Sequence, residues 1–172
     1  MLKCCFTGLR PQKLSFSENS EIYKLILKKL DQILKQLINA YHVNYFISGM
    51  ALGWDTWCAK EILVLKNEYP EIILECALPC KNQDKYWNIS DKISYQEVLS
   101  HSDKVIYIQH NFSYNGIMER NRYMVDCSRY VIALWDGQSG GTEKTLRYAI
   151  DQNKRIIVLN PIDLKISTKN GK

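Results

Sequence analysis

The sequence lacks the ligand patterns of a metalloprotein. Its three histidines, His42, His101 and His110, do not have zinc-ligand spacing, and its six cysteines include no C-x-x-C pair. Cys4 and Cys5 are adjacent in an expected strand and therefore point to opposite faces of a sheet. These patterns predict no metal site and no disulfide framework. They favour reduced, partly buried thiols in a cytosolic protein.

Long apolar runs and internal divisions are also absent from the sequence. The apolar run at the N-terminus is only a few residues long, too short for a signal peptide or a membrane span. The 172 residues contain no repeat, no low-complexity segment and no linker, and this length suits one domain. We expect one cytoplasmic domain over residues 1–161, then a short basic tail at 162–172, and no membrane partner.

The charge of the chain is mild. Part of the formal net charge of +5 comes from Lys165, Lys169 and Lys172 in the expected tail. The sequence has no basic, aromatic-rich stripe of the kind that nucleic-acid-binding proteins carry. This argues against nucleic acid as a partner, and it is compatible with a small anionic ligand.

Short apolar segments alternate with helical patterns along the chain. The expected strands are 2–6, 43–47, 71–78, 104–108, 130–134 and 155–159. The expected helices are 22–40, 90–100, 117–127 and 142–152, with one more that follows the second strand and ends near Glu68. This alternation predicts an α/β fold: a Rossmann-like, doubly wound domain whose mainly parallel sheet has helices on both faces. Pro161 is expected to end the regular structure.

One stretch, from Ser48 to Glu61, organises the rest of the chain. A buried strand ends at Ser48-Gly49, the backbone turns through Gly53, and a helical pattern follows. Such a turn exposes backbone N–H groups to anions. By itself the stretch is either a phosphate-binding loop or an ordinary strand-to-helix turn with Asp55 in the first helical turn.

Two more glycine turns follow expected strands. Thr7-Gly8-Leu9-Arg10 comes after the first strand, and the segment 136–143 with Gly140-Gly141-Thr142 comes after the fifth. In an open parallel sheet, ligands bind outside the carboxyl ends of the strands. Three such turns together predict a nucleotide or another phosphorylated ligand.

Four segments occur together, in order and at suitable distances: 6–11 (FTGLRP), 48–55 (SGMALGWD), 120–124 (RNRYM) and 136–142 (DGQSGGT). Together they resemble the YpsA-like group of the SLOG superfamily. That superfamily also holds the DNA-processing protein DprA and the LOG phosphoribohydrolases. The resemblance covers about residues 2–160, nearly the whole chain.

The resemblance implies that the glycine turns hold a nucleotide or a derivative related to NAD or ADP-ribose. It implies a sensor or regulator that requires no cofactor and forms homo-oligomers. The candidate ligand-binding residues from the turns, their surroundings and the resemblance are Thr7, Gly8, Arg10, Ser48, Gly49, Gly53, Asp55, Trp87, Arg120, Asp136, Gly140, Gly141 and Thr142.

The LOG enzymes suggest an alternative function, cleavage of a nucleotide N-glycosidic bond. The chain departs from their pattern, because Thr145 stands where they have a glutamate and the acidic residue is Glu143, directly after the threonine. Glu143 and Glu119 are the candidate bases, and Arg120 is the candidate phosphate holder. Two further alternatives come from the wider superfamily: DprA-like binding of single-stranded DNA, and capture of a cyclic nucleotide signal in phage–host conflict.

Several side chains have two interpretations at this point. Arg10 is either a ligand contact or a surface arginine capping a carbonyl. Asp55 either binds a ribose hydroxyl or favours the start of its helix. Trp87, next to Tyr86 in a polar connection, either stacks on a base or packs against its own loop. Trp54 either covers a base or seals the start of a helix.

Two arginines of the fourth expected helix compete for one site. Arg120 and Arg122 are two positions apart, so both cannot face the same ligand. The resemblance favours Arg120. Thr142 is expected to cap the helix that follows it.

Overall fold

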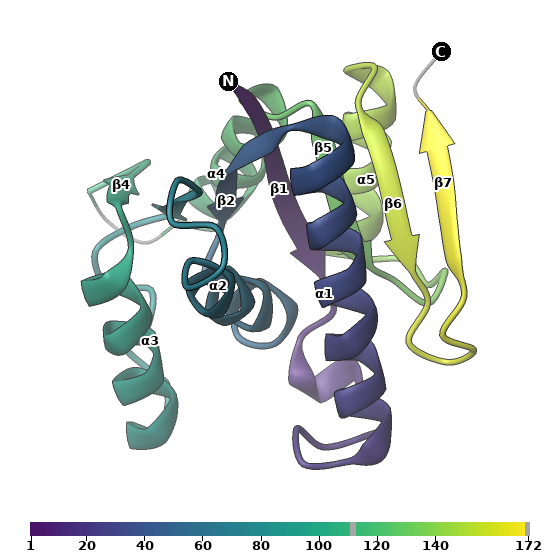
Figure 1. Ribbon diagram of the computed structural model, residues 1–172. Coiled ribbons are helices and arrows are strands. Elements are labelled where there is room, and N and C mark those ends of the chain that lie inside the picture. Colours follow the sequence, from purple (N-terminus) through teal and green to yellow (C-terminus); the bar gives the residue numbers. More distant parts are fainter. Residues whose placement is uncertain (111–112, 171–172) are drawn as a thin grey trace.

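Seven strands form one sheet in the part of the chain that the structure describes, residues 1–110 and 113–170. In this computed structural model the strand order is β4-β3-β2-β1-β5-β6-β7 (Figure 1). The strands are β1 Leu2–Gly8, β2 Val43–Ser48, β3 Ile73–Leu78, β4 Lys104–Tyr107, β5 Tyr130–Leu134, β6 Arg155–Leu159 and β7 Ile166–Asn170. Strands β1 to β6 are parallel, and β7 is antiparallel to β6. The predicted Rossmann-like α/β fold is confirmed.

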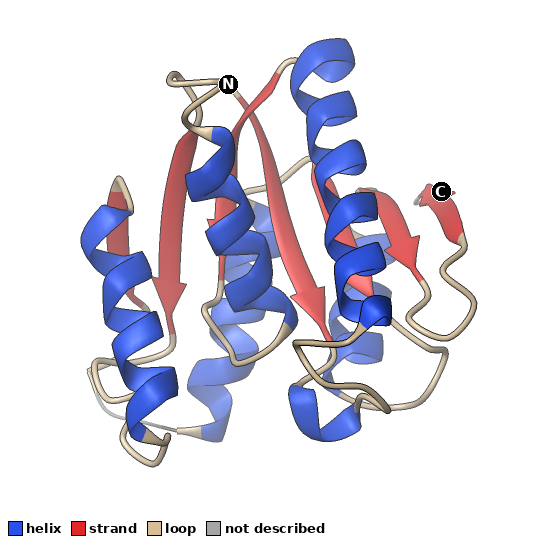
Figure 2. Cartoon of the chain, turned by 60° about the horizontal axis from the view of Figure 1, so that its bottom comes forward, coloured by secondary structure: helices blue, strands red, loops and turns tan. Residues whose placement is uncertain are grey.

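Helices cover both faces of the sheet (Figures 1 and 2). They are the 3-10 helix η1 Pro11–Lys13 and the α-helices α1 Glu21–Tyr41, α2 Trp54–Leu65, α3 Ile89–His101, α4 Tyr114–Asp126 and α5 Gly141–Asp151. Side chains of α1, α2 and α3 pack with Cys4 and Phe46 in one core cluster. Side chains of α4 and α5 pack with Cys5 and Ile47 in a second cluster. The adjacent cysteines therefore point to opposite faces, as predicted from strand geometry.

The first helix shows why these boundaries form. The hydroxyl of Ser20 accepts a hydrogen bond from the backbone N–H of Tyr23, which satisfies one of the free donors at the start of α1. Apolar side chains at helical spacing, from Ile26 to Ile38, bury one face of α1. The helix ends at His42, which adopts the left-handed conformation with φ 55°.

The C-terminal segment is a correction to the sequence prediction. The part expected as a frayed basic tail contains β7, which pairs with β6 from Leu159↔Ile166 to Arg155↔Asn170. All of β7 is exposed at the sheet edge, so no apolar pattern marks it. Backbone hydrogen bonds to β6, and not burial of its side chains, hold β7 in the sheet.

The start of α4 also differs from the prediction. The helix begins at Tyr114, three residues before the expected position, because the hydroxyl of Ser113 accepts from the backbone N–H of Gly116. The segment 109–116, which the sequence pattern leaves as a loop between the expected strand 104–108 and the expected helix 117–127, therefore ends within α4, and its residues 111–112 lie outside the described ranges.

The strand order brings the first and third glycine turns next to each other, at the carboxyl ends of β1 and β5. After β1 the chain builds β2, β3 and β4 on one side, and it then returns to build β5 on the other side of β1. A doubly wound sheet reverses direction at such a switch point, and a crevice opens there at the carboxyl ends of the strands. Gly8 and Leu134 are paired at this end of β1 and β5. The first and third glycine turns therefore meet at the switch point.

Candidate functional site

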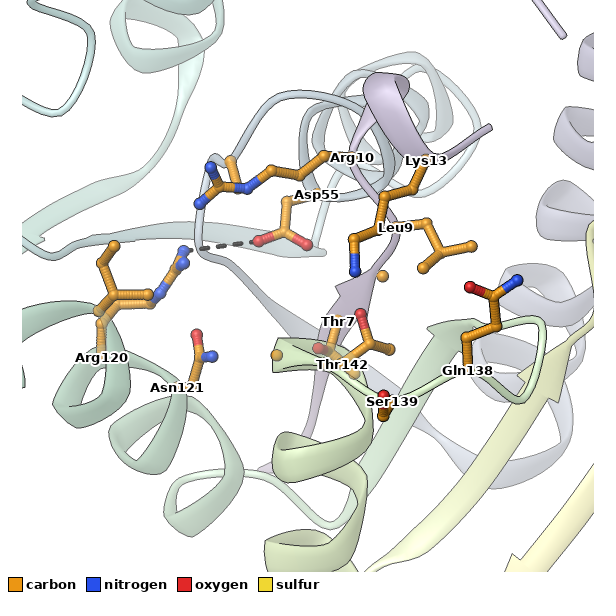
Figure 3. Close-up of a pocket in the computed structure, with 15 residues that line it drawn as sticks. Thr7, Leu9, Arg10, Lys13, Asp55, Arg120, Asn121, Gln138, Ser139 and Thr142 are labelled. Atoms are coloured by element: carbon orange, nitrogen blue, oxygen red, sulfur yellow. Dashed lines mark hydrogen bonds and ion pairs between the residues drawn. The ribbon is translucent and has the colours of Figure 1, made fainter. Parts of the chain in front are cut away.

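A cavity of about 150 Å³ lies at the switch point, and we call it the inner cavity. Four separate segments line it. They supply Thr7, Gly8, Leu9, Arg10 and Lys13 after β1; Ala51 and Asp55 after β2; Ile117, Arg120 and Asn121 from α4; and Gln138, Ser139, Gly140, Gly141 and Thr142 after β5. Figure 3 shows Arg120 reaching from α4 toward Asp55, with Lys13 and Thr142 across the cavity. All three predicted glycine turns thus contribute to one site.

Glycine at position 49 makes room for an arginine. A β-carbon built at Gly49 would lie 1.5 Å from Nη1 of Arg120 and 2.8 Å from Oδ2 of Asp55. At Gly53 the backbone has φ +89°, and a β-carbon there would lie 2.9 Å from the carbonyl oxygen of Leu9. The Ser48–Asp55 turn therefore needs glycine at both positions, for close approach and for conformation.

Arg120 is the most unusual side chain of the site. It is 4% exposed, and burial lowers the pKa of its guanidinium. Its contact with a carboxylate is long, 3.5 Å from Nη1 to Oδ2 of Asp55. Its Nε has no hydrogen-bond partner among the described residues. A buried cation with spare N–H donors at a cavity is suited to bind an anion.

Asp55 is a buried carboxylate beside this cation. Burial raises the pKa of Asp55 to about 6, and the opposing effects of Arg120 and Arg10 are smaller. The hydroxyl of Ser48 donates a hydrogen bond to the backbone carbonyl of Asp55 at 2.8 Å and so links the two ends of the Ser48–Asp55 turn. Asp55 therefore changes charge near neutral pH, next to the place where an anion would bind.

Two helices begin at the inner cavity. Their N-caps are Gly53 for α2 and Gly140 for α5, and glycine has no side chain with which to cap the helix. The expectation that Thr142 caps α5 is wrong, because Thr142 lies inside the first turn. At the start of α2 the backbone N–H groups of Trp54 and Thr56 donate to the carbonyls of Leu9 and Ala51. The first backbone N–H groups of α5 stay available near the cavity, which favours negative charge there.

A second cavity, of about 570 Å³, continues the first, and we call it the outer cavity. The two cavities share Arg10, Ala51, Ile117 and Arg120. The rest of the outer wall is Gln12, Leu52, Pro79, Gln83, Tyr86, Trp87, Asn88 and Asp91. Trp87 is therefore on the wall of the outer cavity.

Some predicted residues lie elsewhere. Glu143 forms an ion pair with Arg147 at 2.6 Å, and Glu119 accepts a hydrogen bond from Gln109 at 2.7 Å. Asp136 accepts from the backbone N–H of Gln138. None of these carboxylates is among the described residues that line either cavity.

Ser48 and Trp54 are buried next to the glycine turns and line neither cavity. Ser48 is buried, and its hydroxyl accepts from the backbone N–H of Met50. Trp54 is fully buried, and its indole N–H donates to the carbonyl of Ile132. A β-carbon at Gly8 would lie 2.5 Å from Trp54, so the indole fills the space beneath the first glycine turn. Trp54 therefore seals the helix start and does not face a ligand.

The choice between the two arginines of α4 follows the prediction. Arg120 lines both cavities, whereas Arg122 is exposed and lies over the ring of Tyr148 at 5.7 Å. Their two-residue spacing places them on different sides of the helix.

Sequence reasoning missed Lys13. This residue ends η1, lines the inner cavity, and its Nζ would lie 3.1 Å from a β-carbon at Gly140. Pro11 at the start of η1 is the local signal, because proline favours the first position of a helical turn. Gln138 and Ser139 were also missed as individual contacts, although the turn that contains them was predicted.

The described ranges contain neither a candidate metal site nor a candidate membrane span. Histidine, cysteine, aspartate and glutamate side chains form no group of three that could hold a metal ion in residues 1–110 and 113–170. In the same part of the chain, no helix has the length and hydropathy needed to cross a membrane.

Comparison with known proteins identifies the family. The sequence pattern of YpsA, described as the YspA SLOG family, matches residues 4–164. The chain belongs to this family. It is 33% identical over 136 residues to the SPbeta prophage-derived protein YoqJ of Bacillus subtilis (strain 168), covering 70% of this chain and 78% of YoqJ. It is 26% identical over 141 residues to the UPF0398 protein YpsA of the same strain, covering 80% of this chain and 78% of YpsA.

Solved structures of DprA share the fold with this YpsA-family chain. The chain matches DprA from Helicobacter pylori with a TM-score of 0.62 and 19% identity, over 91% of this chain and 64% of that one. That structure describes a single-stranded DNA binding mode of DprA. The match to DprA from Streptococcus pneumoniae has a TM-score of 0.63 and 18% identity, over 91% of this chain and 50% of that one. At these identities the similarity shows a common fold, and the chain spans about half to two thirds of each DprA chain.

Proposed function

We propose that this protein binds a nucleotide or a nucleotide derivative of the NAD or ADP-ribose kind, as a sensor or regulator. The observation that carries the proposal is Arg120, a buried guanidinium at the wall of the inner cavity whose N–H donors have one partner among the described residues, Asp55 at 3.5 Å. Leaving such donors without partners costs free energy, and a bound phosphate oxygen would relieve that cost.

The charges around the inner cavity favour an anion. Arg10, Lys13 and Arg120 line it, and Asp55 is the one carboxylate among its described lining residues. The start of α5 adds backbone N–H donors at the same place. Three cations against one titratable carboxylate give a positive site that suits phosphate.

The sizes of the two cavities support a ligand larger than phosphate. The inner cavity of about 150 Å³ is smaller than ordinary small-molecule pockets, which are about 300–1,000 Å³. The outer cavity of about 570 Å³ adjoins it across Arg10 and Arg120. A phosphate in the inner cavity would leave room for the remainder of a nucleotide in the outer one.

Isothermal titration with ADP-ribose, NAD and AMP tests the proposal. We expect binding of at least one of them by the native protein and a loss of tenfold or more in Arg120→Met. Arg122→Met is the matched control, because Arg122 is on the same helix but faces away from both cavities. Absence of binding to all three ligands, or equal losses in both variants, would contradict the proposal.

Localisation and assembly belong to the same proposal. The cysteines in the described chain are free thiols, five of them buried, which supports the cytoplasm or another reducing compartment. Homo-oligomer formation stays a prediction from the family resemblance.

A further inference from the structure

The outer cavity has a wall that phosphate binding does not explain. We propose that it is a base subsite, in which a nucleobase stacks on Trp87 and donates a hydrogen bond to Oε1 of Gln83. This inference rests on the proposed function, since it assumes that the inner cavity holds the phosphate of the same ligand. It narrows the ligand to a nucleoside 5′-phosphate or a larger molecule that contains one.

Trp87 is held in position for stacking. It is half-buried in an otherwise polar connection, and its ring meets Tyr95 in a T-shaped contact with centroids 5.1 Å apart. Tyr95 is itself 1% exposed in α3, so this contact is fixed by the core. The neighbouring Tyr86 is 89% exposed and has no such support. Trp87 is therefore the aromatic side chain of this wall whose orientation the core fixes before a ligand binds.

Gln83 supplies a directed acceptor on the same wall. Its Nε2 donates to the carbonyl oxygen of Met50 at 2.7 Å and, more weakly, to that of Gly49 at 3.4 Å. Carbonyl oxygens only accept hydrogen bonds, so the amide cannot be flipped, and Oε1 remains as an acceptor. The edges of nucleobases carry N–H donors, which single bases present to proteins for recognition.

The apolar part of the outer wall suits a flat ring. Pro79, Leu52 and Ile117 line the cavity together with Trp87. Stacking on an aromatic side chain binds any base, because every base has a π-face. The subsite is therefore expected to recognise the presence of a base more strongly than its identity.

The position of Arg120 connects the two subsites. Gln83 holds the backbone of Gly49 and Met50, and the guanidinium of Arg120 packs against Gly49. Arg120 and Arg10 border both cavities. A ligand would therefore extend from a phosphate at Arg120 to a base at Trp87, with the sugar between them.

Ligand truncation combined with side-chain truncation tests the base subsite. The probes are AMP, GMP, CMP, UMP and ribose 5-phosphate, titrated calorimetrically into the native protein, Trp87→Ala and Trp87→Phe. We expect at least one nucleotide to bind tenfold or more tightly than ribose 5-phosphate, which is within the range for base–aromatic stacking. Trp87→Ala should remove this difference without changing the affinity for ribose 5-phosphate, and Trp87→Phe should retain most of it.

Tyr107→Ala is the matched control, since Tyr107 is an exposed aromatic residue that is outside both cavity walls. Equal affinity of the native protein for nucleotides and ribose 5-phosphate would overturn the base subsite and leave phosphate binding intact. Equal weakening of both ligand types by Trp87→Ala would also overturn it, because that result indicates a general structural role. Absence of binding to every probe would overturn the base subsite, and absence of binding to ADP-ribose and NAD as well would overturn the proposed function.

Discussion

The guanidinium of Arg120 occupies the space that a side chain at position 49 would need: its Nη1 is 1.5 Å from where a β-carbon of residue 49 would lie. Gly49 follows β2 and Arg120 belongs to α4, so residues 71 positions apart in the sequence depend on each other. The second glycine turn therefore makes room for the arginine of α4.

Gly49→Ala should therefore damage both stability and binding. The added methyl group cannot coexist with the present position of Arg120, and overpacking of this kind costs about 1–3 kcal/mol. We expect a lower free energy of unfolding in urea, and a loss of ADP-ribose or AMP binding as large as that of Arg120→Met.

Gly141→Ala is the control for this change. A β-carbon at Gly141 would have no other described atom within 4 Å, and alanine favours helix in the first turn of α5. We expect unchanged or slightly greater stability. If Gly49→Ala were as stable as Gly141→Ala, the close packing of Gly49 and Arg120 would be contradicted.

The charge of Asp55 should make anion binding depend on pH. Burial raises the pKa of Asp55 to about 6, so the carboxylate is mostly neutral at pH 5 and ionised at pH 7.5. A bound anion raises that pKa further, and each unit of the rise corresponds to about a tenfold change in affinity. We therefore expect ADP-ribose, whose diphosphate charge is constant over this range, to bind more tightly at pH 5 than at pH 7.5.

Asp55→Asn separates this effect from other titrations. The asparagine keeps the shape of the side chain and has no charge, so the affinity of the variant should be nearly constant between pH 5 and 7.5. Calorimetric titrations at four pH values measure both proteins. An affinity of the native protein that increases with pH would contradict the assignment of Asp55.

The carboxylates named for catalysis allow a test of the hydrolase alternative. Glu143 and Glu119 have partners outside the cavities, in Arg147 and Gln109. We expect Glu143→Gln and Glu119→Gln to change nucleotide affinity less than twofold. Chromatographic analysis for free base, after incubation with a nucleotide panel, should find no release by any of these proteins. Base release that Glu143→Gln abolishes would instead establish the enzyme.

A buried carboxylate of β3, on the face of the sheet that α4 and α5 cover, gives a stability prediction. Glu75 accepts hydrogen bonds from the hydroxyls of Tyr45 and Tyr123 and pairs with Lys104 at 2.9 Å. Burial raises the pKa of Glu75, but these three partners outweigh burial and leave the pKa below its ordinary value. Glu75→Gln should cost about 1.5–3 kcal/mol at neutral pH, the range for hydrogen bonds to a charged group.

The pH dependence of that cost has a definite sign. Because the folded-state pKa is lowered, the stabilisation is present above the unfolded pKa and is lost as the pH falls through the folded one. Urea unfolding from pH 7 down to pH 3.5 should show the difference between native protein and Glu75→Gln becoming smaller. A constant difference over that range would assign the cost to packing, and nucleotide binding at pH 7 should be equal in both proteins.

Most of the fold could be predicted because the central strands β1, β2, β3 and β5 are largely buried on both faces. Such strands are nearly continuous apolar runs, as in 130–134, and β5 and β6 have the predicted bounds. The exposed strand β7 could not be found in this way. This segment is a strand because it pairs with β6. Its exposed residues, including Lys169, have the sequence pattern of a solvated tail.

The location of the site could be predicted, but the directions of its side chains could not. The glycine turns were found from the ends of strands, and the sheet order then brought the turns after β1 and β5 together. Whether Glu143 faces a cavity depends on its partner Arg147, one helical turn further on. The turn of η1 places Lys13 at the cavity, close to Gly140. The two residues are far apart in the sequence, so their proximity could not be predicted.

The antiparallel direction of β7 has a practical consequence for experiments. The cavities open at the carboxyl ends of the parallel strands. Residue 1 precedes β1, and residue 170 ends the antiparallel strand β7, so both lie at the amino ends of the parallel strands (Figure 1). An affinity tag, a dye or a surface tether at either end would therefore leave the ligand entrance uncovered. Immobilised protein should bind nucleotides with the same affinity as protein in solution, whichever terminus is attached.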